Sequence, residues 1–314
     1  MSTFSTRWSG SVVPALLGMA LVVGNAGSSA FAQDLFVRAE QVIYRGDPSS
    51  RSGIKLGGWG SGMCEESTLH ASSGSRSLKV TPKNLYAGGR IDFTNPVDLA
   101  KSFNMPDAYL QLEIKFGGTR SQYESWAVGL APPGATDMYA GTTSKGKPVR
   151  RVRIMLCLDG GQKLESQVDL NGFMLSGEGW MTVSLPLAVL KGSLDLSEYK
   201  LRRLVIAGDG TVPFHIGEIR TIRDTTPLQA DAGEEKEVAK NYNIAFHSTC
   251  RSGASAVKYS WDFDEQDGIQ EEAVGDLVYH RFRKPGNLVV TLTVSDVFGL
   301  KEPSTSIINV KVNE

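Results

Sequence analysis

Apolar and polar residues alternate along much of the chain. The clearest runs cover residues 110–116, 152–158 and 288–294, where an aliphatic or aromatic residue occupies every second position. Successive side chains of a β-strand point to opposite faces, so such a run predicts a strand with one face buried and one face open. The chain shows no long stretch with the 3.6-residue period of an amphipathic helix. We therefore expect an all-β protein.

Glycine and proline clusters separate these runs. They include Gly57-Gly58, Gly88-Gly89, Gly117-Gly118, Pro132-Pro133-Gly134, Gly160-Gly161 and Gly208-Asp209-Gly210. Many short strands divided by such turns are typical of β-sandwiches and barrels. Pro227, within residues 225–228, stops one β pattern before the next begins. We expect a first domain at residues 34–225 and a second at residues 229–314.

Residues 1–32 have the pattern of an export signal. Arg7 supplies one positive charge, residues 11–23 form a short apolar core, and Ala30-Phe31-Ala32 gives the small-x-small pattern of a cleavage site. The apolar core is short for a transmembrane helix, and no later stretch is apolar enough to span a bilayer. We expect cleavage before Gln33 and a mature chain that is secreted, periplasmic or held at the cell surface, with no membrane insertion.

Composition and charge narrow the class of function. Of the 314 residues, 41% are hydrophobic and 21% are charged, which is enough for two folded domains. The net charge of −1 gives no field that would attract nucleic acid, so no nucleic-acid partner is expected. Cys64, Cys157 and Cys250 have no zinc-site spacing. A Cys64–Cys157 bridge is one interpretation, and three small, half-buried thiols are the favoured one.

The segment from residue 229 to residue 314 carries an ordered set of motifs. They are Ala230-Asp231-Ala232-Gly233, the KYSWDF run at 258–263, Pro285-Gly286, the VTLTVSD run at 290–296 and Phe298-Gly299. In order and spacing they resemble a PKD domain, the Ig-like module named from polycystin. The resemblance implies a β-sandwich that acts as a spacer or contact surface. Trp261 and Phe263 alternate with Asp262, so both rings are expected on one face, in a small core.

Residues 34–225 carry a more diffuse set of matches. They are Val42-Ile43-Tyr44, residues 73–80, residues 86–91, the GWMTVSLPL run at 179–187 and residues 214–219. Together they resemble a galactose-binding-like jelly roll of the carbohydrate-binding-module type. The resemblance implies a carbohydrate-binding head with a structural calcium near the first and last strands, held by Glu40 and Glu218. The alternative is that both glutamates are solvated or paired on the surface.

Sugar binding needs flat rings that stack on pyranose C–H faces, together with polar groups that hold hydroxyls. Trp59, in the loop-like sequence GGWGSG, is the first candidate ring, and Tyr139, in a polar glycine-rich segment, is the second. Tyr86 is a further candidate. Arg151 and Arg153 should point to the open face of their strand, where they would bind carboxylates or sulfates of an acidic glycan. An open face that only keeps the protein soluble is the competing interpretation.

The sequence lacks the common catalytic motifs. It contains no GxSxG elbow, HExxH helix or phosphate-binding loop, and its four histidines are scattered over both expected domains. We expect a non-catalytic protein that binds a polysaccharide or cell-surface glycan, with other envelope proteins as further partners. The alternatives are a structural or adhesive surface protein that binds a protein partner, and a divergent polysaccharide hydrolase.

Overall fold

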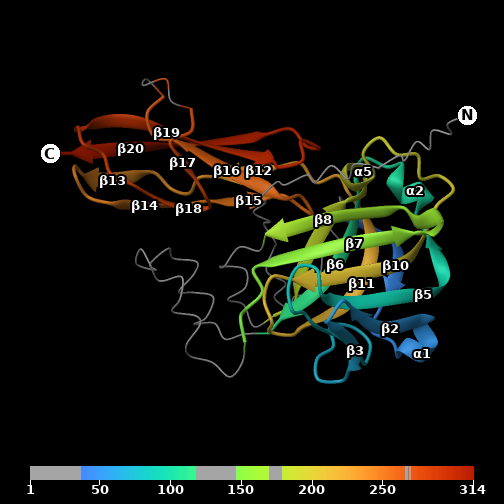
Figure 1. Ribbon diagram of the computed structural model, residues 1–314. Coiled ribbons are helices and arrows are strands. Elements are labelled where there is room, and N and C mark those ends of the chain that lie inside the picture. The colour runs from blue at the N-terminus through green and yellow to red at the C-terminus, as the bar shows by residue number, and fades with distance from the viewer. Residues whose placement is uncertain (1–36, 118–145, 170–178, 266–267, 269) are drawn as a thin grey trace, which may run out of the picture.

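The computed structural model describes residues 37–117, 146–169, 179–265, 268 and 270–314. Within these residues nearly all regular structure is β-strand, which confirms the predicted all-β class. The predicted export signal at 1–32 lies outside the described residues. Figure 1 shows two bodies in succession along the chain, a broad N-terminal sandwich and an elongated C-terminal domain.

Two antiparallel sheets form the N-terminal domain. Sheet 1 has the order β3-β4-β11-β6-β9, with β1 also paired to β11, and sheet 2 has the order β2-β5-β10-β7-β8. The chain crosses between the sheets repeatedly, as a jelly roll does. Sheet 1 comprises β1 (Val37–Tyr44), β3 (Met63–Ser67), β4 (Ser77–Thr81), β6 (Ala108–Phe116), β9 (Met181–Pro186) and β11 (Phe214–Asp224). Sheet 2 comprises β2 (Ile54–Trp59), β5 (Gly88–Asp98), β7 (Arg151–Leu158), β8 (Lys163–Asp169) and β10 (Lys200–Gly208).

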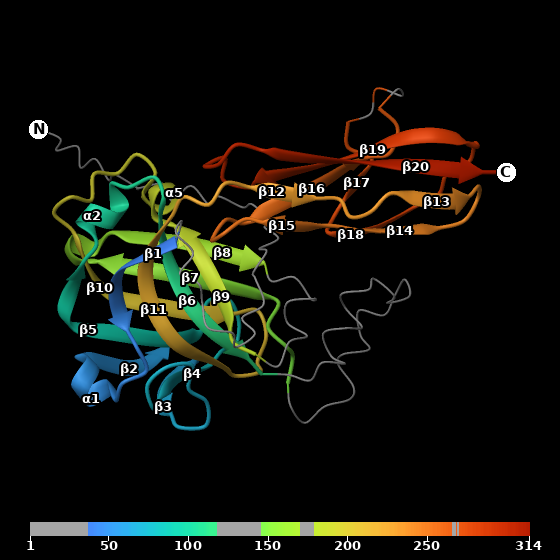
Figure 2. The same cartoon turned by 180° about the vertical axis from the view of Figure 1, so that it is seen from behind.

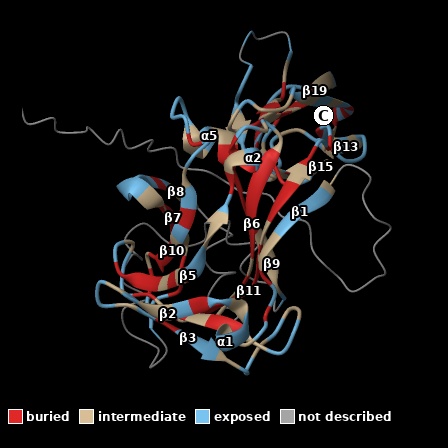
Figure 3. Ribbon diagram, turned by 90° about the vertical axis from the view of Figure 1, so that its right-hand side faces the viewer, coloured by how far each residue is buried: buried red, intermediate tan, exposed pale blue. Residues whose placement is uncertain are grey.

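The core between the two sheets follows the predicted alternation. Val152, Ile154 and Leu156 of β7 are completely buried, as are Leu112 and Ile114 of β6 in the facing sheet. Figure 3 shows buried residues concentrated along the strands that face one another. Short helical segments connect some of the described strands: α1 (Ser49–Ser52), α2 (Ala100–Phe103), η2 (Asp159–Gly161) and α5 (Leu187–Lys191).

The C-terminal domain has a five-stranded sheet and two strand pairs. The sheet has the order β13-β20-β19-β16-β17, and the pairs are β12-β15 and β14-β18. Trp261 and Phe263 share one face as predicted; their rings stack with centroids 6.0 Å apart, and both are fully buried. The strands are β12 (Gln229–Asp231), β13 (Lys236–Ala239), β14 (Ile244–His247), β15 (Thr249–Arg251), β16 (Val257–Asp262), β17 (Ala273–Val274), β18 (Leu277–His280), β19 (Gly286–Asp296) and β20 (Ser304–Asn313).

The segment that joins the domains is partly buried. The strand β11 ends at Asp224 and β12 begins at Gln229, at the predicted boundary, but Thr226 between them is inaccessible to solvent. Ala256 belongs to the apolar core of the N-terminal domain, and Phe298 packs against that core. The two domains therefore meet in a packed interface near α2 and α5, from which the C-terminal domain projects (Figure 2).

Candidate functional site

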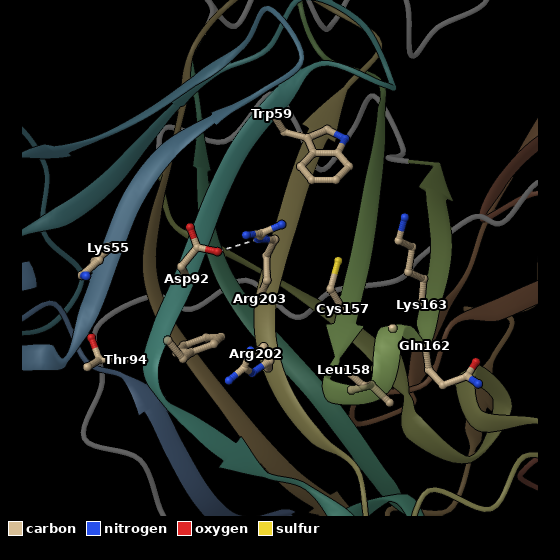
Figure 4. A pocket seen from close by; sticks show the side chains of 12 residues that line it. Lys55, Trp59, Asp92, Thr94, Cys157, Leu158, Gln162, Lys163, Arg202 and Arg203 are labelled. Carbon is tan, nitrogen blue, oxygen red and sulfur yellow. Dashed lines mark hydrogen bonds and ion pairs between the residues drawn. The ribbon is translucent and has the colours of Figure 1, made fainter.

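A pocket of about 560 Å³ opens on the face of sheet 2 that points away from the core. Its volume is typical of sites that bind small molecules or one stretch of a polymer. Figure 4 shows side chains from all five strands of the sheet around it. The lining residues are Lys55, Trp59, Asp92, Phe93, Thr94, Cys157, Leu158, Gly161, Gln162, Lys163, Arg202 and Arg203.

The floor of the pocket is one row of the β-ladder. Lys55 pairs with Asp92, Asp92 with Arg203, Arg203 with Cys157, and Cys157 with Lys163. Residues directly opposite one another in antiparallel strands present their side chains on the same face. Five side chains from five neighbouring strands therefore lie in a line across the sheet, roughly 19 Å long at about 4.8 Å per strand spacing.

A β-bulge in β10 adds a further cation to this row. The pairing of β10 with both neighbours passes from Leu201 to Arg203 and leaves Arg202 without a ladder partner. An extra residue in one strand shifts the alternation, so two successive side chains reach the same face. Leu201 is fully buried in the core, whereas Arg202 and Arg203 both line the pocket.

Asp92 organises the arginines of this face. Arg203 Nε donates a hydrogen bond of 2.5 Å to Asp92 Oδ1, and Arg90 Nε lies 2.8 Å from Asp92 Oδ2. Gly57 leaves room for the second arginine, because a Cβ at this position would stand 2.9 Å from the Arg90 guanidinium. The carboxylate is thereby engaged on both oxygens by guanidinium groups.

Two aromatic residues line the pocket: Phe93, which belongs to the apolar core, and Trp59. Trp59 is the last residue of β2 and pairs with Gly88 of β5, so the predicted loop at GGWGSG begins as a strand. The ring is half-buried and belongs to no apolar core among the described residues. The guanidinium carbon of Arg203 lies 5.9 Å from the ring centroid. Trp59 thus lies outside the apolar cores of the described residues.

Tyr86 and Arg153 form a second contact on the same side of the sheet. Tyr86 is 67% exposed, in the turn between β4 and β5, and the Arg153 guanidinium carbon lies 5.2 Å from its ring centroid. Arg153 faces outward as predicted, but its side chain is nearly buried and is paired with Glu165. The expectation of an openly accessible Arg153 is therefore wrong, because the residue is held between a ring and a carboxylate.

Arg151 and Tyr139 complete the predicted ligand set. Arg151 precedes Arg153 by two residues on β7, so it shares the outward face, but it does not line the pocket. Its main-chain N–H donates to Asp209 Oδ1 over 2.9 Å, which anchors the start of the strand. Tyr139 lies outside the described residues.

The two glutamates predicted for calcium do not converge. Glu40 falls at a register shift of β1 opposite Thr221 and Ile222, whereas Glu218 lies further along β11, about 10 Å away at 3.3 Å per residue. Each has a cationic neighbour: Lys101 Nζ is 3.2 Å from Glu40, and Arg220 is 3.5 Å from Glu218. In the part of the chain that the structure describes, no three His, Cys, Asp or Glu side chains gather as metal ligands.

The three cysteines are all free thiols. Cys64 is buried in the core of the sandwich, where desolvation raises the pKa of its thiol to about 12. Cys157 faces the other way, into the pocket, and burial also raises the pKa of its thiol. The two therefore lie on opposite sides of sheet 2. Cys157 and Cys250 are half-buried thiols as expected, whereas Cys64 is fully buried.

A Ser–His contact lies on the outward face of sheet 1. Ser77 Oγ is 3.0 Å from His215 Nδ1, and the His70 ring meets the His215 ring edge-on with centroids 4.7 Å apart. Desolvation, with the neighbouring His70, lowers the pKa of His215 to about 4, so the ring is neutral at pH 7. Ser77 is completely buried. Its hydroxyl is therefore inaccessible to a substrate, although His215 is the kind of partner that could activate a serine nucleophile.

The row of pocket cations was absent from the sequence prediction. Lys55, Lys163, Arg202 and Arg203 line the pocket, yet each looks like an ordinary exposed polar position within a strand. One local signal exists: the doublet Arg202-Arg203 interrupts the alternation between Leu201 and Ile206. Two adjacent polar residues in an otherwise alternating strand indicate a bulge, and bulges occur often beside functional sites.

Comparison with protein families identifies the C-terminal domain. The family described as "PKD domain" matches residues 225–312. These residues form a PKD domain. The match confirms the resemblance drawn from the motifs of residues 229–314, and the stacked Trp261 and Phe263 are the centre of its core.

Solved structures offer distant likenesses. The chain is similar to the CBM22-1–GH10 modules of endo-1,4-β-D-xylanase 10B from Clostridium thermocellum, complexed with xylohexaose, at 11% identity and a TM-score of 0.27, over 67% of this chain and 34% of that one. Fibronectin(III)-like modules of Clostridium thermocellum CbhA match at 10% identity and a TM-score of 0.23, over 55% of this chain and 82% of that one. The chain thus spans about a third of the xylanase structure, and TM-scores of this size do not establish a shared fold.

Two further comparisons are negative. The search of curated proteins gave no match. No helix within the described ranges has the length and apolar character needed to cross a bilayer.

Proposed function

We propose that this protein is an exported, non-catalytic binding protein whose N-terminal domain holds a polysaccharide or cell-surface glycan in the pocket of sheet 2. The observation that supports this best is the position of Trp59. Its ring lines an accessible pocket of about 560 Å³ and is not needed for the core. An indole face presented to solvent is suited to stack on the C–H face of a pyranose.

Polar side chains complete the chemistry that a sugar requires. Thr94 and Gln162 line the pocket and are exposed, so their hydroxyl and amide groups are available to sugar hydroxyls. Rigid strands hold them, since Thr94 lies on β5 and Gln162 immediately precedes β8. A ring that gives affinity and a few fixed polar groups that give orientation are the usual composition of a ligand site.

The PKD domain serves as a contact surface fixed to this head. The packed interface at Ala256 and Phe298 holds it against the sandwich. A glycan bound on sheet 2 and a partner bound on the PKD domain would therefore be kept at a set separation, unlike two modules on a flexible linker.

A protein partner is the second candidate, and the β14–β18 strand pair favours it. Leu277 and Tyr279 are two residues apart on β18 and so share a face, and they are 45% and 63% exposed. Neighbouring apolar side chains that remain in water are typical of protein contact surfaces. In this alternative the first domain is structural and binding occurs on the PKD domain.

Affinity electrophoresis against a panel of soluble polysaccharides tests the proposal, followed by calorimetry with oligosaccharides of any that retard the protein. We expect Trp59→Ala to weaken binding at least tenfold. Tyr242→Ala is the control, because Tyr242 is as exposed as a binding ring (68%) but lies on the PKD domain. If no polysaccharide is bound, and Leu277→Ser with Tyr279→Ser releases a protein partner, the protein-binding alternative is correct.

A further inference from the structure

The pocket on sheet 2 carries a concentrated positive charge. Four of its lining residues are cationic, Lys55, Lys163, Arg202 and Arg203, and one is anionic, Asp92. The chain as a whole has a net charge of −1. The positive charge is therefore local to the site, and it opposes the sign of the whole molecule.

Internal pairing does not account for this charge. Asp92 accepts Arg203 on one carboxylate oxygen and faces Arg90 with the other, so it is fully engaged by arginines. Lys55 stands opposite Asp92 in the ladder but makes no ion pair with it. Within the described part of the chain, Lys55, Lys163 and Arg202 have no carboxylate partner.

The unpaired cations come from three different strands. Lys55 lies on β2, Lys163 on β8 at the opposite edge of the sheet, and Arg202 projects from the bulge of β10 between them. Figure 4 shows the three side chains at different sides of the cavity, with Trp59 at one end. Together they place cationic donors along a row that a polymer lying across the strands would follow.

The bulge in β10 allows both arginines to face the pocket. Without it, alternation would send one of the two successive residues Arg202 and Arg203 into the apolar core, where a charge is costly. With it, Arg203 binds Asp92 and stands beside Trp59, while Arg202 remains available. The strand thus contributes one arginine that builds the pocket and one that is left for a ligand.

We propose that the ligand of this pocket is an acidic polysaccharide, whose carboxylate or sulfate groups are bound by Lys55, Lys163 and Arg202 while Trp59 stacks on a sugar ring. The inference rests on the proposed glycan-binding function and adds the class of glycan. Guanidinium and ammonium groups form their strongest hydrogen bonds with oxyanions, whereas the hydroxyls of a neutral sugar would leave these cations without a counter-charge.

Matched polymers separate charge from sugar shape. Polygalacturonate and its fully methyl-esterified form share one backbone and differ in the charge of the carboxyl groups; dextran sulfate and dextran make the corresponding pair for sulfate. We expect the protein to bind at least one acidic polymer at least tenfold more tightly than its neutral partner. The acidic polymer that is retained assigns the anionic group. Binding should also weaken as NaCl is raised, because salt screens exposed ion pairs.

Two double variants test whether the pocket cations bind the acidic polymer. Lys163→Gln combined with Arg202→Gln should lower affinity for the acidic polymer at least tenfold and leave affinity for the neutral polymer unchanged. Arg283→Gln combined with Lys284→Gln removes the same charge from two adjacent, exposed residues of the PKD domain and should have no effect. Circular dichroism of each variant checks that the fold is retained, which is expected because all four side chains are at the surface.

Each other outcome overturns the inference in a distinguishable way. Equal affinity for acidic and neutral polymers, still dependent on Trp59, refutes the acidic ligand and keeps the glycan function. Equal losses in the pocket variant and in the PKD control show attraction by general surface charge and refute the site. Absence of binding to every polymer refutes the proposed function together with the inference.

Discussion

Lys301 of the PKD domain donates a hydrogen bond of 2.7 Å from Nζ to Asp224 Oδ2 at the end of β11, and the two side chains are 10% and 0% exposed. Asp224 also accepts the main-chain N–H groups of Thr226 and Ala254, over 2.9 Å and 2.6 Å. Lys301 makes a second bond to the Ser252 carbonyl over 2.9 Å. This buried and fully hydrogen-bonded ion pair fixes the orientation of the two domains, because moving one domain would leave a buried charge without its counter-ion.

Asp224→Ala should therefore destabilise the protein by about 3–5 kcal/mol, since it leaves Lys301 buried without a counter-ion. Urea unfolding followed by tryptophan fluorescence measures this, with both domains carrying tryptophans. Glu237→Ala is the control: its pair with Lys311 is about 60% exposed on both sides, so its loss should change the free energy of unfolding far less than Asp224→Ala does. Similar small losses in both variants would contradict the proposed role of Asp224.

Gly88 should be intolerant of any side chain. A Cβ at Gly88 would stand 2.2 Å from the Ile206 carbonyl oxygen, which is backbone of the neighbouring strand and cannot move aside. Gly88→Ala should cost about 1–3 kcal/mol of unfolding free energy. At Gly57 the obstacle is the mobile end of the Arg90 side chain at 2.9 Å, so Gly57→Ala should cost clearly less in the same urea titration. The reverse order would contradict the close packing of β5 on β10.

Acid should destabilise the protein partly through His215. Its folded-state pKa of about 4 lies below the ordinary 6.5, so the unfolded state binds a proton more readily between these values. The stability that the neutral ring contributes is complete above about pH 6.5 and is lost as the pH falls toward 4. Burial is the main cause, and His70, Lys79 and Lys115 also face the ring.

His215→Asn should consequently flatten the dependence of Tm on pH between 6.5 and 4. Differential scanning calorimetry at several pH values measures the slope. His247→Asn is the matched control, because His247 is exposed on β14, and it should retain the slope of the parent protein. An unchanged slope in the His215 variant would mean that other groups govern acid sensitivity.

The cysteines should report occupancy of the pocket. Iodoacetamide should modify Cys157 slowly in the folded protein, because burial raises its pKa and lowers the thiolate fraction, and Cys64 only after unfolding. A saturating glycan should protect Cys157 and leave modification of Cys250, which lies on β15 of the PKD domain, unchanged. Mass spectrometry of peptides from labelled protein gives each rate separately. Equal rates at Cys157 with and without a bound glycan would place the ligand elsewhere.

Local pattern explains why the strands and the PKD domain were predictable. Alternation in residues 152–158 and 288–294 places every second side chain on one face whatever the strand pairs with, so buried Ile154 and Leu292 follow from neighbours in sequence. The KYSWDF run likewise places Trp261 and Phe263 together on one face of the chain. Trp59 is flanked by glycines, so the sequence alone indicated a ring that lies outside an apolar core.

The candidate site, by contrast, depends on contacts between residues that are distant in the sequence. Strand register brings Lys55, Arg203 and Lys163 into one row, although they lie far apart in the chain. Ion pairing also distinguishes residues that look alike in sequence. Arg153 is paired with Glu165 and nearly buried, whereas Arg202 is exposed and has no carboxylate partner among the described residues. Alternation fixes which face a side chain takes, and only the packing of strands decides the bulge, the register and the counter-ion, because these depend on groups that meet after folding.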